Sequence, residues 1–141
     1  MTIKVFNHEK IVSKGVISEL RKICSRILCH ANVLGYSKDD QFAIHLAMEE
    51  AVVNAVRHGN KQDAEKDVVI EYDLSPEKIE LWVTDQGRGF KPEDVADPRS
   101  GENIYKAGGR GVLLIKSYMN NVEYNKTGNS VRMTKINSSR V

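Results

Sequence analysis

The sequence is poor in the residues that mark secreted or membrane proteins. Only two of its 141 residues are cysteine and three are proline, and no apolar run approaches the roughly 20 residues that a membrane span needs. The N-terminus has no apolar signal core, so we expect a cytoplasmic protein with reduced, buried thiols. Cys24 and Cys29 lie five residues apart in one predicted helix and point in different directions. Neither has metal-ligand spacing to a histidine, which argues against zinc.

The sequence also lacks a large excess of charge of either sign. The chain has 21 Lys and Arg against 19 Asp and Glu, a formal net charge of +2. The basic residues are scattered, with a mild excess at Arg132, Lys135 and Arg140. A clustered basic face is typical of nucleic-acid binding, so we expect no direct contact with nucleic acid and none with a membrane. A 40% hydrophobic content suffices for a core, and the length predicts a single domain over residues 1–141.

A nearly continuous apolar run from Lys38 to Gly59 predicts a long, buried helix. Ser37 precedes it and can cap its first turn, and Gly59 suits its end. Glu50 and Asn54 are spaced i, i+4 and share one face. A carboxylate on a buried helix is costly unless it has a partner or a chemical role.

Glu50 and Asn54 allow two interpretations. An Asn carbonyl oxygen is a hard ligand suited to Mg²⁺, which keeps several waters and phosphate oxygens. A Glu one turn away can hold one of those waters or take a proton from an attacking hydroxyl. The alternative is that Glu50 reaches solvent and Asn54 caps a neighbouring backbone.

The second motif, Asp85-Gln-Gly-Arg-Gly89, follows a predicted strand over Lys78–Thr84, where polar and apolar residues alternate. Gly87 and Gly89 permit tight turns and close approach to a flat ligand. Because an ionised Asp only accepts hydrogen bonds, Asp85 can accept from the exocyclic amine of adenine. The alternative is an ordinary Asp-Gly turn after a strand.

A third motif, with the glycines Gly108, Gly109 and Gly111, lies directly before the apolar run that begins at Val112. Glycines at a helix N-terminus let phosphate approach free backbone N–H groups, and Arg110 or Lys106 can add positive charge. The motif lacks the Gly-Lys-Ser/Thr ending of a Walker A loop. The alternative is a flexible linker before a core helix.

The remaining pattern predicts hairpin-linked strands and three helices. Thr2–Phe6 and Val68–Leu74 are candidate strands, and a helix runs to about Ala31 from a start between Glu9 and Ser18. Two further strands are joined by a turn at Thr127-Gly-Asn129. Hairpins with helices are typical of an α+β two-layer sandwich with the helices on one face. The two further strands are Val122–Lys126 and Ser130–Ile136.

In order and spacing, the three motifs resemble those of the GHKL (Bergerat-type) ATPase and kinase superfamily. The Glu-x-x-x-Asn-Ala-x-x-His-Gly form of residues 50–59 is similar to that of the anti-sigma-factor serine/threonine kinases. The resemblance implies the Bergerat fold, a mixed, mostly antiparallel sheet with three helices on one face. Many superfamily members have Gly-Thr before the last strand, where the hydroxyl supports the adenine site. Here the run is Gly128-Asn-Ser130, so Asn129 or Ser130 would substitute.

The resemblance also implies roles for residues. Glu50 would be the general base, Asn54 the Mg²⁺ ligand and Asp85 the adenine reader. Gly87 and Gly89 would shape the adenine pocket. Residues 90–107 would form a lid over ATP, and their prolines and glycines are typical of a mobile segment. The phosphates would be approached by Gly108, Gly109, Arg110 and Gly111.

The expected function is therefore an ATP- and Mg²⁺-dependent serine/threonine protein kinase. It would phosphorylate a small partner, by resemblance a STAS-type anti-anti-sigma antagonist, and would bind a sigma factor; a homodimer is also implied. The alternative is a nucleotide-gated protein-binding module without significant turnover, in which ATP orders a partner surface. No helical hairpin carries a phosphoacceptor His, which argues against a complete sensor histidine kinase.

Overall fold

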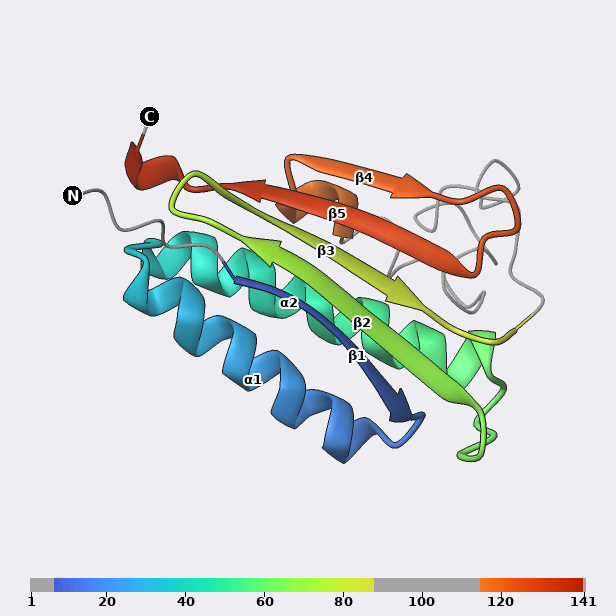
Figure 1. Cartoon of the computed structure of the whole chain (residues 1–141). Helices are drawn as coiled ribbons and strands as arrows, with labels where there is room; N and C mark the ends of the chain where they lie inside the picture. Colours follow the sequence, from blue (N-terminus) through green and yellow to red (C-terminus); the bar gives the residue numbers. More distant parts are fainter. Residues whose placement is uncertain (1–6, 88–114, 141) are drawn as a thin grey trace.

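The computed structural model describes residues 7–87 and 115–140, which form a five-stranded sheet with helices on one face (Figure 1). The spatial order of the strands is β1-β2-β3-β5-β4, and each neighbouring pair is antiparallel. This confirms the predicted α+β sandwich with a mostly antiparallel sheet. The strands are β1 Asn7–Lys14, β2 Asp67–Leu74, β3 Lys78–Thr84, β4 Asn121–Tyr124 and β5 Ser130–Ile136.

Two long helices cover the inner face of the sheet (Figure 1). They are α1 Ile17–Val33 and α2 Lys38–Asn54, and α2 continues directly into a π-helical turn, η1 Ala55–Gly59. Residues 115–118 are the described part of a third helix. A short 3₁₀ helix, η4 Ser138–Arg140, follows β5. Ser37 caps α2 as predicted, since its hydroxyl accepts from the Asp40 N–H at 3.0 Å.

The core lies between this helical layer and alternate residues of the strands. The alternation predicted for β3 is confirmed, because Ile79, Leu81 and Val83 are buried while Trp82 and Thr84 on the other face are not. The largest completely buried side chains come from both layers: Leu20, Ile27, Ile44, Met48, Ile70, Tyr72, Leu74, Ile79, Leu81, Ile115 and Met133.

The strand predicted over Thr2–Phe6 lies outside the described residues. The first described strand, β1, occupies Asn7–Lys14, which the sequence did not indicate. Among the described strands it pairs only with β2, and its side chains alternate between exposed and half-buried. An edge strand of this kind buries little apolar surface, so its sequence carries only a weak hydrophobic alternation.

Two predictions of burial hold only in part. Most apolar residues of the predicted buried helix are buried in α2, but Phe42 is 57% exposed and makes an edge-to-face contact with Tyr118, with the ring centroids 6.1 Å apart. A wide apolar stripe buried on one side can extend to an exposed edge. Of the two thiols, Cys24 is buried, and this burial raises its pKa to about 12, whereas Cys29 is exposed. No described helix is long and apolar enough to cross a membrane.

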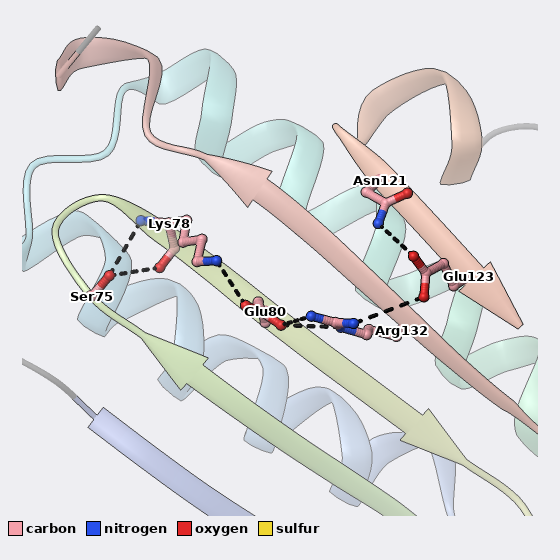
Figure 2. Close-up of polar contacts among 6 residues, drawn as sticks. All are labelled: Ser75, Lys78, Glu80, Asn121, Glu123 and Arg132. Carbon is pink, nitrogen blue, oxygen red and sulfur yellow. Dashed lines mark hydrogen bonds and ion pairs between the residues drawn. The ribbon is translucent and has the colours of Figure 1, made fainter. Parts of the chain in front are cut away.

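The outer face of the sheet is held together by paired charges (Figure 2). Glu80 on β3 accepts from Lys78 at 3.0 Å and from Arg132 on β5 at 2.6 Å, and the hydrogen bond from Arg132 lowers the pKa of its carboxyl. Arg132 also lies over the ring of Trp82, 5.6 Å from its centroid. These contacts across the strands support the register of β3 with β5, which places Ser130 opposite Thr84.

Candidate functional site

The C-terminal turns of α2 carry two of the predicted site residues. Glu50 and Asn54 are both half-buried and lie one helical turn apart. Within the described residues, neither side chain has a hydrogen bond or an ion pair. The neighbouring Glu49 differs, because Arg21 donates to it at 3.0 Å and thereby lowers the pKa of its carboxyl. Of two adjacent glutamates, one is thus engaged in an ion pair and the other is available.

The helix widens directly after Asn54. The N–H of Asn60 donates to the carbonyl of Ala55 at 2.8 Å, which closes the π-helical turn η1. Widened turns of this type occur frequently at functional sites. The predicted end of the helix at Gly59 is confirmed, but the π-helical geometry of its last turn was not expected from the sequence.

Asp85 lies just beyond β3, where β5 begins beside it. Its N–H donates to the carbonyl of Asn129 at 2.9 Å, and the Asn129 side-chain amide donates to its carbonyl at 3.2 Å. The hydroxyls of Thr84 and Ser130 are 2.7 Å apart. Both residues predicted to substitute for the family's Gly-Thr pair therefore support the end of β3, Asn129 at Asp85 and Ser130 at Thr84.

The carboxylate of Asp85 is partly satisfied by its own turn. The N–H of Gly87 donates to Oδ1 at 2.7 Å, whereas Oδ2 has no hydrogen-bonding partner among the described residues. Burial raises the pKa of the Asp85 carboxyl, and the Gly87 N–H opposes that rise. A half-buried acceptor with one available oxygen suits a ligand that donates an N–H group.

Close packing brings the first two motifs together. A Cβ atom placed on Gly59 would lie 2.2 Å from both Cγ and Oδ2 of Asp85. A Cβ atom on Gly87 would lie 1.9 Å from the carbonyl oxygen of Gly59. Any side chain at either glycine would therefore occupy space that the Asp85 turn or the Gly59 backbone now fills. The end of η1 and the turn after β3 form one compact unit.

The other predicted site residues lie outside the described residues. These are Gly89 of the second motif, the lid over residues 90–107, and the third motif with Gly108, Gly109, Arg110 and Gly111. Within residues 7–87 and 115–140, no group of three or more His, Cys, Asp or Glu side chains could hold a metal ion. A Mg²⁺ that takes one protein ligand together with phosphate and water oxygens requires no such group.

Sequence reasoning missed one residue beside this unit. Asn60 follows Gly59 and is 0% exposed, yet the sequence analysis assigned it no role. Its type is common in exposed turns, so only an alignment or the fold itself distinguishes it from its neighbours.

Comparison with known proteins finds relatives of this chain in sequence and in structure. A family model described as a histidine kinase-like ATPase domain matches residues 14–135. The chain is 31% identical to the serine-protein kinase RsbW of Listeria innocua, covering 100% of this chain and 90% of the relative. It is 32% identical to RsbW of Bacillus subtilis, covering 79% and 74% of the two chains.

Among solved structures, the chain is similar to the crystal structure of the RsbU and RsbW domains of Rv1364c from Mycobacterium tuberculosis. The TM-score is 0.61 at 17% identity, and the match covers 92% of this chain and 32% of the other. At this identity the likeness supports the fold alone. It agrees with the α+β sandwich described above.

Proposed function

Since the chain belongs to the histidine kinase-like ATPase domain family, as a serine-protein kinase of the RsbW type, we propose that its ATP site is the unit formed by α2, η1 and the turn after β3. The observation that carries this proposal is the contact of Gly59, Asp85 and Gly87. In this arrangement the half-buried Asp85 carboxylate lies beside the backbone of two glycines, and its Oδ2 has no hydrogen-bonding partner among the described residues.

In this proposal Asp85 selects the base. Adenine presents an exocyclic amine, which donates to Oδ2, whereas guanine presents a carbonyl oxygen at the same position. Two acceptors facing each other cannot form a hydrogen bond, so guanine would leave the carboxylate unpaired. Gly87 keeps Oδ1 occupied and so fixes which oxygen faces the base.

The half-buried face of α2 would supply the chemistry. Asn54 would hold Mg²⁺ through its carbonyl oxygen, and the bound ion supplies neutralisation of the phosphate charge. Glu50 would take the proton of a serine or threonine hydroxyl while that oxygen bonds to the γ-phosphorus and ADP leaves. The availability of Glu50, in contrast to the Arg21-paired Glu49, supports this assignment.

The partner assignment remains a proposal drawn from the relatives. A small STAS-type anti-anti-sigma protein would be the phosphoacceptor, and a sigma factor would be a second partner. A homodimer and a cytoplasmic location belong to the same proposal. The glycines of the third motif, with Arg110, would contact the phosphates beneath a lid over residues 90–107. A binding module without turnover is not favoured, because relatives that match 79–100% of this chain are serine-protein kinases.

A matched pair of glutamate substitutions tests the catalytic part. We expect Glu50→Gln to bind Mg-ATP with wild-type affinity in calorimetry and to lose roughly 10²- to 10⁴-fold in transfer of labelled phosphate to the STAS-type partner. Glu49→Gln should keep the transfer rate, because its carboxylate pairs with Arg21 instead. Equal transfer rates for Glu50→Gln and wild type would remove Glu50 from the mechanism. Tight Mg-ATP binding by the wild type with no transfer to any STAS-type protein would favour the binding module.

A further inference from the structure

Asn60 is one of three buried polar or charged residues in the described part of the chain, with Asp40 and Asn137. It directly follows Gly59, whose backbone touches the Asp85 turn. Burying an amide side chain costs free energy unless its donors and acceptors are paired. The partners of Asn60 therefore show what its burial achieves.

The Asn60 side chain joins two backbone segments that are distant in sequence. Its Oδ1 accepts from the N–H of Gln86 at 2.8 Å, and its Nδ2 donates to the carbonyl of Asp67 at 3.0 Å. The same two segments are joined again, because the Gln86 side chain accepts from the Asp67 N–H at 2.8 Å. Asn60, Gln86 and Asp67 thus form a closed set of three hydrogen bonds.

This set acts on the peptide directly after the adenine-reading residue. Gln86 lies between Asp85 and Gly87, and the Gly87 N–H is the group that fixes Oδ1 of Asp85. Asn129 binds Asp85 on both sides, because its carbonyl accepts from the Asp85 N–H and its side-chain amide donates to the Asp85 carbonyl. Asn60 accepts from the Gln86 N–H of the peptide whose carbonyl Asn129 binds, so both polar groups of the peptide directly after Asp85 are paired. The Asn60 N–H also closes η1. The three hydrogen bonds among Asn60, Gln86 and Asp67, called the clamp below, are therefore connected to the helix that carries Asn54.

We propose that Asn60 is a positioning residue for nucleotide recognition, which fixes the direction of the Asp85 carboxylate and so sets the preference for adenine over guanine. The inference rests on the proposed function of the same site. Asn60 has no contact with the base in this proposal and acts only through the Gln86 peptide. Its loss should therefore weaken ATP binding and reduce base selectivity without removing a reacting group.

The test compares Asn60→Ala with Asn137→Ala in calorimetric titrations with Mg-ATP and Mg-GTP. Asn137 is a matched control, because it is 1% exposed and its side chain also bridges two backbone groups. It donates to the Pro76 carbonyl at 2.9 Å and accepts from the Ser139 N–H at 3.0 Å. It lies beside η4, at the opposite end of the sheet from η1 (Figure 1). Both substitutions should lower the unfolding temperature.

Only Asn60→Ala should change recognition. We expect its Kd for Mg-ATP to rise about tenfold or more, and the ratio of the Kd for GTP to the Kd for ATP to fall by a similar factor. Gln86→Ala is a milder variant, since it removes one hydrogen bond of the set from an exposed side chain. It should shift the same ratio in the same direction by a smaller factor, which keeps the test possible if Asn60→Ala does not fold.

Three results would overturn the inference. Wild-type affinity and selectivity in Asn60→Ala, or in a folded Gln86→Ala if Asn60→Ala is unstable, would show that the clamp does not position Asp85. Equal losses of affinity in Asn60→Ala and Asn137→Ala would show that Asn60 contributes to folding stability only and does not position Asp85. Failure of the wild type itself to bind Mg-ATP would remove the proposed function and this inference together, so the two failures are distinguishable.

Discussion

Replacing Gly59 by alanine should weaken nucleotide binding while leaving the fold intact. The added Cβ would lie 2.2 Å from Cγ and Oδ2 of Asp85 and 2.6 Å from Oδ1. Ordinary van der Waals contact begins near 3.4 Å, so the carboxylate has to move by about 1.2 Å, the difference between 3.4 and 2.2 Å. A hydrogen bond cannot follow a displacement of this size, because its donor–acceptor distance is only about 2.7–3.2 Å.

The size of the effect follows from the lost bond. A hydrogen bond to a charged group contributes about 1.5–3 kcal/mol, so the Kd for Mg-ATP should rise roughly 10- to 150-fold. The fold should tolerate the change, because Gly59 does not have a positive φ and the atoms displaced belong to a side chain. Alanine is also the better former of a helical turn. Calorimetry and thermal unfolding measure the two quantities separately.

Gly35→Ala is the matched control for this substitution. Gly35 has a φ of +84° and nothing within 4 Å of its built Cβ, so alanine there is strained but displaces no neighbour. We expect it to lose about 1–2 kcal/mol of stability and to keep its affinity for Mg-ATP. If Gly59→Ala instead bound Mg-ATP like the wild type, the contact between the helix end and Asp85 would have no part in recognition.

Two further substitutions test electrostatics. Burial raises the pKa of the Asp85 carboxyl in the folded protein above its unfolded value of 3.8. The free energy of unfolding of the wild type should therefore fall as pH rises from the unfolded to the folded pKa, and this effect of Asp85 should stay constant at higher pH. The stability of Asp85→Asn relative to wild type should therefore increase as pH rises through the same range and then level off, and the variant should lose Mg-ATP binding. Denaturant unfolding at a series of pH values measures this difference in stability. A difference that does not change with pH would contradict the burial argument. Asp40→Ala should cost about 2–4 kcal/mol, because the Asp40 carboxylate accepts from the N–H and the hydroxyl of Ser138, each at 2.8 Å. Asp39→Ala, on the exposed side of the same turn, is its control, and equal unfolding free energies would show that η4 is not held by Asp40.

Much of the fold follows from local pattern. The strand over Lys78–Thr84 was predicted with its observed bounds, because one of its faces is buried and the other is solvated. The long helix was predicted from its cap at Ser37 to its end at Gly59. The edge strand β1 was not, because pairing on one side leaves little apolar alternation.

The same division applies to the site. Glu50, Asn54 and Asp85 could be proposed from sequence because the three motifs occur together in an order that resembles the GHKL superfamily, whereas each motif alone also fits an ordinary helix or turn. The sequence could not show that Gly59 packs against Asp85, because these residues are 26 positions apart (85 − 59) and meet only through the sheet.

The sequence by itself determined the residue types that can bind a nucleotide and the elements that carry them. The tertiary structure alone decided which of those groups are available. The spacing to Asn54 singles out Glu50 in the sequence, but only the position of Arg21 on α1 shows that the neighbouring Glu49 is paired. Asn60 looks like a turn residue until β2 and the turn after β3 close around it. The reason is physical: hydrogen bonds and desolvation depend on distance between atoms, and for residues far apart along the chain the fold alone sets that distance.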